Sequence, residues 1–182
     1  HSIGQLFDNF SANASGSVHE GVQQVATPIN YNPKNAFVNS RGCVACELYS
    51  VADSFSLDSG ASWYTVVDSA LLVQKRDNGA DLTKVCVSLV DNMSQLFLSN
   101  VSFNQDISGW DVSNVNDMSV MFGFATAFNQ DIGNWDVGNV NEMSLMFYGA
   151  SAFDQDLSGW CVSNVPSLPV NFSTSSPLST AH

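Results

Sequence analysis

Four cysteines are the most reactive side chains in this 182-residue sequence. Cys43 and Cys46 form a Cys-Val-Ala-Cys motif, which has the spacing of a thiol–disulfide exchange site. Such a site needs a strand followed by a helix, and the surrounding residues do not predict that arrangement. We therefore expect the cysteines to form structural disulfides rather than a redox centre.

The three histidines, His1, His19 and His182, all lie near the ends of the chain. Their positions exclude a Ser-His-Asp triad or a histidine-based metal site in the central part of the sequence. An N-terminal histidine is also found in the histidine brace of copper monooxygenases, but that site needs a second histidine on a β-sandwich core. We expect no catalytic residues and no enzymatic activity.

Aspartates recur at a constant spacing of 25 residues. They fall in two phases, Asp81/Asp106/Asp131/Asp156 and Asp111/Asp136. Stacked carboxylates are compatible with calcium, which takes six to eight oxygen ligands. They are equally compatible with turns in which each aspartate accepts a backbone N–H. Because no calcium-loop spacing is present, we favour the turns and expect no cofactor.

The aspartate spacing belongs to a longer repeat. The sequence reads FNQDISGWDVSNVNDMSVMF at 103–122 and FNQDIGNWDVGNVNEMSLMF at 128–147, and a third copy begins with FDQDLSGWCVSNV at Phe153. A degenerate copy in the same phase runs from Asp81 to Phe97. The chain therefore contains about four repeats, with a period inside the range of leucine-rich solenoids.

Within one repeat the apolar period changes. Trp110, Asp111 and Val112 alternate as in a short strand, with Asp111 and its equivalent Asp136 outward, and apolar residues then recur at helical spacing from Val115 to Phe122. Neither element buries its apolar face alone, so we expect the repeats to stack with parallel strands ~4.8 Å apart. The prediction is an α/β repeat solenoid of leucine-rich-repeat type.

Two aligned columns receive structural interpretations. The tryptophan column Trp110/Trp135/Trp160 alternates with valines, which favours a place in the core over sugar binding. The asparagine column Asn114/Asn139/Asn164 is expected to be buried and to bond the backbone of the neighbouring repeat.

The repeat resembles that of the BspA-like leucine-rich-repeat surface proteins, whose units read close to FNQDISGWDVSNVTDMSxMF. The resemblance covers roughly residues 78–177. It implies a solenoid fold, an extracellular or cell-surface location, attachment through protein contacts, and no catalytic residues. The chain departs from the family pattern where NVT becomes NVN at Asn114 and Asn139, which removes a glycosylation sequon from each repeat.

The residues outside the repeats are expected to form the segments at the two ends of the solenoid. We assign 1–42 to an N-terminal arm, 43–77 to an N-terminal cap, 78–177 to the repeats and 178–182 to a tail. The cap should contain a hairpin within 51–67, followed by a helix that Asp68 caps and Gly79 stops.

The two ends of the repeat array differ in their predicted structure. Pro166, Pro169 and Asn171, which takes the place of a core methionine, make the last repeat atypical, as a C-terminal cap should be. The arm fits a helix or a strand, and it fits docking on its own solenoid or on a neighbouring subunit.

The composition of the chain limits the classes of binding partner and the cellular location that we expect for the protein. The net charge is −12, with 17 acidic against five basic residues, which argues against nucleic acid. No apolar run approaches the ~20 residues of a membrane span. The first residue is His1 rather than Met, which fits a processed secreted chain or a trimmed one. Candidate glycosylation sites, also typical of secretion, are Asn9, Asn13, Asn92, Asn100 and Asn171.

The cysteine spacing limits the possible disulfides. Cys86 and Cys161 share one phase three repeats apart, about 14 Å, whereas a disulfide needs Cα atoms within ~7 Å. Cys43 and Cys46 both precede the cap hairpin, which should lie near Cys86, so either of them can pair with Cys86, and we favour Cys46. That pairing leaves Cys43 and Cys161 at opposite ends, where head-to-tail subunits would join them. The alternatives are a Cys43–Cys46 bridge, or a partner for Cys161 beyond His182.

These observations favour a non-enzymatic extracellular protein that self-associates head to tail, as a subunit of a glycosylated surface filament. The alternative is a monomeric adhesin or lectin-like module that binds other surface proteins or glycans through Asp111 and Asp136. A secreted enzyme is the weakest hypothesis.

Overall fold

The computed structural model describes residues 36–178, apart from 47 and 59. The chain divides into two units, 1–31 and 32–182, and all described residues belong to the second. Most of the predicted arm, with Asn9 and Asn13, and all three histidines lie outside the described residues. Residues 36–42, which we assigned to the arm, instead form part of a hairpin that packs on the repeats.

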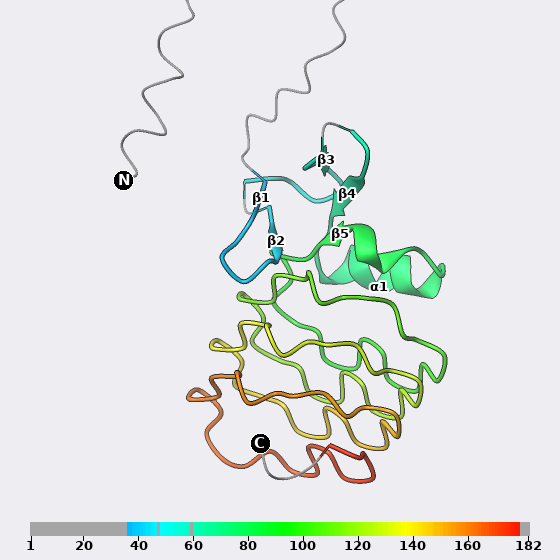
Figure 1. Cartoon of the computed structure of the whole chain (residues 1–182), viewed down its shortest axis with the longest axis vertical. Helices are drawn as coiled ribbons and strands as arrows, with labels where there is room; N and C mark the ends of the chain where they lie inside the picture. Colours follow the sequence, from blue (N-terminus) through cyan, green and yellow to red (C-terminus); the bar gives the residue numbers. More distant parts are fainter. Residues whose placement is uncertain (1–35, 47, 59, 179–182) are drawn as a thin grey trace, which may run out of the picture. The chain divides into compact units, whose positions relative to one another are not determined.

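The regular elements lie in the first part of the described chain (Figure 1). They are β1 (Phe37–Val38), β2 (Val44–Ala45), β3 (Ser54–Ser56), β4 (Trp63–Val66), α1 (Ser69–Asp77), the 3-10 helix η2 (Leu82–Lys84) and β5 (Val85–Cys86). β1 and β2 form one antiparallel pair. β3 and β4 form another, and β5 extends it by pairing in parallel with β4.

The predicted hairpin and helix are confirmed. β3 and β4 pair antiparallel on either side of Asp58 and Gly60, as the strand and turn residues indicate. The Asp68 side chain accepts the Leu71 N–H at the start of α1, which satisfies one of the free donors of the first turn. Gly79 follows the helix with φ +68, a conformation that glycine adopts without strain.

The repeats lie one on the next and are joined by backbone hydrogen bonds (Figure 1). Between 93 and 99 every second N–H donates to the carbonyl 24 residues later, as Met93 does to Asp117 at 2.9 Å. The N–H groups between 118 and 124 repeat the pattern, and Met118 donates to Glu142. The connecting peptides therefore share one direction, with carbonyls toward the N-terminal repeat and N–H groups toward the C-terminal one.

The predicted strand and helical turn of each repeat take a different form. Of the described residues between 87 and 178, none lies in a helix or an extended strand, and Trp110 forms only an isolated bridge. The expected helical segment is a series of turns in which Val120 and Phe124 adopt positive φ. Alternate N–H groups of this segment donate to the neighbouring repeat, whereas those of Met121 and Gly123 donate within their own turn.

The apolar columns form one continuous core. Trp110 and Trp135 are buried with parallel rings 6.4 Å apart, and each indole N–H donates to a carbonyl of the preceding repeat. The Phe97, Phe122 and Phe147 rings stack at 5.5 Å. This confirms the core interpretation of the tryptophan column.

Polar side chains join the repeats at their surface. The side-chain amides of Asn114 and Asn139 each donate at 2.7 Å to a carbonyl of the preceding repeat, as predicted, and Asn164 does so at 2.6 Å. These asparagines are exposed, so the expectation that they are buried is wrong. The turns around them place the amide at the rim of the stack.

The aspartate columns are turn residues. Each accepts the N–H two residues later, at Asp81, Asp106, Asp111, Asp131, Asp136 and Asp156. Hydrogen bonds from the Ser108 hydroxyl and N–H lower the pKa of Asp106, so this carboxylate is ionised at neutral pH. Among the described residues no three such side chains come together in a way that would hold a metal ion.

Candidate functional site

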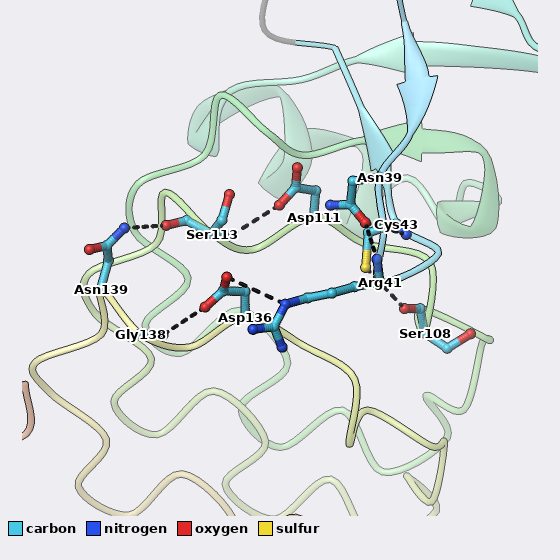
Figure 2. Close-up of polar contacts among 9 residues, drawn as sticks. All are labelled: Asn39, Arg41, Cys43, Ser108, Asp111, Ser113, Asp136, Gly138 and Asn139. Carbon is cyan, nitrogen blue, oxygen red and sulfur yellow. Dashed lines mark hydrogen bonds and ion pairs between the residues drawn. The ribbon is translucent and has the colours of Figure 1, made fainter. Parts of the chain in front are cut away.

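The β1–β2 hairpin lies against the predicted binding face around Asp111 and Asp136 (Figure 2). Asp111 is 4% exposed, so the expectation that it points outward is wrong. Asp136 pairs with Arg41, whose Nε lies 3.5 Å from the carboxylate. The Val44 N–H donates to Gly109 at 2.9 Å and anchors the hairpin on the repeat.

The hairpin turn explains how Arg41 reaches the acidic column. The Asn39 side chain accepts the N–H groups of Arg41 and Cys43, both at 3.0 Å, and Gly42 adopts φ +83. This short, internally bonded turn directs the Arg41 side chain along the repeat surface toward Asp136, as Figure 2 shows. A basic residue from the chain itself therefore occupies the face that we expected to bind a partner.

Cys43 belongs to the same hairpin, and its side chain lies between the hairpin and the repeats. Its side chain is buried, and the thiol lies 3.9 Å from the Ser108 carbonyl (Figure 2). Burial, with a smaller contribution from the Asp111 carboxylate, raises the pKa of this thiol, and Arg41 only partly opposes the shift. The thiol is therefore protonated and shielded. This geometry contradicts the expected bond from Cys43 to Cys161 of another copy.

Cys46 and Cys86 form a disulfide with Cα atoms 6.3 Å apart. This confirms the predicted pairing and excludes a Cys43–Cys46 bridge in the folded chain. The bond joins the residue after β2 to the end of β5, so it holds the β1–β2 hairpin to the first repeat. Cys161 is a free, exposed cysteine.

Three candidate glycosylation residues lie in the described part of the chain. Asn92 and Asn171 are exposed, and Asn100 is partly exposed. The Asn92 side-chain oxygen accepts the N–H and hydroxyl of Ser94, its sequon serine, and its amide nitrogen lies 3.4 Å from Asp117. All three side chains lie at the surface, where a glycan has room.

Helix α1 closes the N-terminal end of the repeat stack. Ser69 donates its hydroxyl to the Asn92 backbone carbonyl at 3.2 Å, and the Arg76 guanidinium donates to the Leu96 carbonyl. Leu72 is buried against the core of the first repeat. Two of the carbonyls that end the peptide columns, those of Asn92 and Leu96, are thus paired. A hollow beside Arg76 is lined by Asp77, Gln95, Leu96, Leu98, Ser99 and Asn100.

The C-terminal end of the stack is covered only in part by the described residues, since Leu178 is buried against the core and the Ser176 hydroxyl donates to the Phe153 carbonyl. Val162, in the column of buried Val112 and Val137, is 48% exposed, Leu168 is 91% exposed and Val170 is 65% exposed. The last repeat is therefore atypical, as predicted, and it leaves apolar residues at the surface in this part of the chain. We call this surface, with Val162, Leu168 and Val170, the open end.

A one-residue slip explains the irregular last repeat. Asn116 and Asn141 donate their N–H to the preceding repeat, but Pro166 at the equivalent position has no N–H. Leu145 then donates to Val170, 25 rather than 24 residues later. Asn171 consequently takes the left-handed position of Leu145, with φ +52, rather than the place of a core methionine as we expected.

The open end also presents three backbone donors. Inside the stack, three N–H groups donate to carbonyls of the last repeat: Leu145 to Val170, Phe147 to Phe172, and Gly149 to Thr174. The next N–H groups in these rows of hydrogen bonds belong to Asn171, Ser173 and Ser175. None of the three has a hydrogen-bond acceptor among the described residues. Donors of this kind bond to water at a free surface and require acceptors in an interface.

Comparison with known families identifies the repeats. The family described as Mycoplasma protein of unknown function, DUF285, matches residues 67–181. The chain belongs to this family. The match agrees with a BspA-like repeat family at a general level. The DUF285 segment begins after β4, so both hairpins and Cys46 precede it. No curated protein and no solved structure matches the chain.

Proposed function

We propose that this chain is a non-enzymatic, extracellular or cell-surface repeat protein that acts through protein–protein contacts, and that its repeats form a leucine-rich-repeat-like solenoid. Self-association into a glycosylated surface filament is the specific form of the proposal. The family match and the disulfide fit a surface protein. No helix of the described residues is long and apolar enough to cross a membrane.

The observation that carries the proposal is the difference between the two ends of the stack. One end is closed by α1, and the other exposes Leu168 and Val170 together with backbone donors that the described residues leave unpaired. Exposed apolar residues beside unpaired backbone groups are features of interaction surfaces. A partner that covers this end would bury the apolar groups and supply the missing acceptors.

The alternative, a monomeric adhesin with an acidic binding face, receives less support. Asp111 is buried and Asp136 is paired with Arg41, so the β1–β2 hairpin competes for that face. A ligand would have to displace the hairpin, which the nearby Cys46–Cys86 disulfide holds to the first repeat.

Sedimentation velocity of the native-source protein across a wide concentration range tests the proposal, together with negative-stain microscopy. We expect species larger than the monomer that grow with concentration. A particle that stays monomeric at every concentration would contradict self-association. Intact mass before and after glycosidase treatment tests the extracellular part, and an unchanged mass would count against a glycosylated filament.

A further inference from the structure

We propose that the open end binds the head face of a second copy of this chain. The head face is the exposed apolar surface of the two hairpins, formed by Phe37, Val38, Leu57 and Trp63. This inference rests on the proposed function, because it takes self-association as given. It adds which two surfaces meet and in which direction copies add.

Charge favours contact through the ends. Residues 68–156 contain twelve acidic and three basic residues, whereas 157–182 contain no Asp, Glu, Lys or Arg. Copies that approach side by side bring like charges together, and this repulsion acts over roughly 10 Å at ordinary salt. The open end is free of that penalty, so a weakly charged, apolar surface is the partner that fits it.

Hydrogen bonding excludes contact between two open ends. The backbone groups that end the peptide columns at Asn171, Ser173 and Ser175 are all donors. An identical surface facing them offers donors opposite donors, and each buried unpaired N–H weakens the contact. The association must therefore be heterologous, and a heterologous contact that does not close into a ring forms an open polymer.

The carbonyl row at the other end of the stack is not the partner surface. Ser69 and Arg76 already occupy carbonyls of the first repeat, so the repeats of two copies do not stack directly. The hairpins next to this end supply the acceptors instead. β1 and β3 are edge strands, and an edge strand has backbone carbonyls without a partner in its sheet.

Exposed apolar side chains are sparser along the flank of the stack than at its two ends. Of the described residues between 87 and 161, the exposed large hydrophobic side chains are Leu98, Val101 and Phe124, which are spread over two repeats. The head face and the open end each present a group of such side chains. Burial of two groups of this kind against each other removes apolar surface from water, which favours the contact.

Two sets of charge-introducing substitutions in the full-length chain test the contact by sedimentation velocity. Leu168→Asp with Val170→Asp blocks the open end, and Phe37→Asp with Trp63→Asp blocks the head face. Phe124→Asp is the control on the flank. Circular dichroism and thermal melting establish that each variant is folded, and Val38→Lys is a second head-face variant should the first fail to fold.

The wild type and the Phe124→Asp control should associate equally within about twofold, and each blocked variant alone should lose all species above the monomer. An equimolar mixture of the two blocked variants should form a dimer and nothing larger, because one intact open end and one intact head face remain.

Three results would overturn the inference while self-association stands. One is a head-face variant that associates like the wild type, since another segment, such as residues 1–35, would then occupy the open end. The second is a head-face variant that forms dimers alone, which indicates contact between open ends. The third is an open-end variant that still associates. A wild type that never associates removes the proposed self-association and this contact together.

Discussion

The two ends of the repeat stack finish the same peptide columns in opposite ways. At the N-terminal end the columns present carbonyls, of which Ser69 and Arg76 of α1 satisfy those of Asn92 and Leu96. At the C-terminal end they expose N–H groups, for which the described residues supply no acceptor. The repeat gives the stack a direction, so a segment that covers one end cannot cover the other.

The comparison extends to the core. Trp135 lies between two repeats and is fully buried, whereas Trp160 in the same column is only partly buried because no described repeat follows it. Identical side chains with the same type of indole hydrogen bond therefore differ in burial and in the stacking that Trp135 has with Trp110. This pair allows the contribution of the next repeat to be measured.

The largest effect is expected for Trp135→Ala, which should lower the free energy of unfolding by about 3–5 kcal/mol because it leaves a cavity between repeats. Trp160→Ala should cost less than half as much, since part of its surface is already in water. Chemical denaturation of both variants measures the difference at equal solvent conditions. Equal losses would show that the last repeat is covered as completely as the interior ones.

Removal of the disulfide should have the next largest effect. The double variant Cys46→Ala with Cys86→Ala opens a loop across a sequence separation of 40, and we expect a loss of about 3 kcal/mol. Cys161→Ala is the matched control and should leave the melting temperature unchanged. A disulfide variant as stable as the wild type would mean that the hairpin is held to the first repeat by packing alone.

Arg76→Gln tests the closed end. The change removes the cation that satisfies the Leu96 carbonyl, and we expect a loss of about 1 kcal/mol because a charged donor is replaced by a weaker one. Lys75→Gln, one residue earlier on α1, should change stability by less than about 0.5 kcal/mol. If both substitutions cost the same, α1 closes the stack through its apolar contacts and not through the carbonyls.

The smallest effect is expected for the two free cysteines, Cys43 near the N-terminal end of the stack and Cys161 in the last repeat, which should differ in reactivity. Cys161 is exposed and should react with an alkylating reagent at pH 8, whereas buried Cys43 should react only when the chain opens. The fold raises the pKa of Cys43, so it favours the neutral thiol. The contribution of Cys43 to the free energy of unfolding is therefore fully present below pH 9.0, the ordinary pKa of the thiol, and it decreases as the pH rises above that value.

Mass spectrometry after timed alkylation measures both rates, and denaturation at pH 8 and pH 10 measures the change in stability. Cys43→Ser should lessen the loss of stability at pH 10. Rapid labelling of Cys43 in the native protein would contradict its place beneath the hairpin.

Much of the fold could be predicted from the sequence because residues with the same structural role recur at the same position of each repeat. The tryptophan core and the turn aspartates could be inferred from spacing alone. The β3–β4 hairpin, the cap at Asp68 and the Cys46–Cys86 bond follow from local turn chemistry and simple distances. Each of these depends on residues that are close in sequence or in a fixed phase.

Other features depend on contacts between residues that no sequence pattern indicates. Arg41 and Asp136 lie far apart in the sequence and out of phase with the repeat, so the covering of the acidic face by β1–β2 could not be foreseen. Val120 in a left-handed turn opposes its own backbone preference, and the hydrogen bonds between repeats offset that cost. The slip after Pro166 had a usable signal, because a proline cannot replace the N–H that Asn141 donates.

Residue-resolved hydrogen exchange at two protein concentrations tests the central claim, that the stack is closed at one end and open at the other. It compares three amides inside the stack with three at the open end, namely Leu145, Phe147 and Gly149 against Asn171, Ser173 and Ser175. In dilute solution the inner amides should exchange at least about 100-fold more slowly than the outer ones, and the outer amides should slow when the protein associates. Outer amides that are already protected in dilute solution, or that stay fast after association, would contradict this claim.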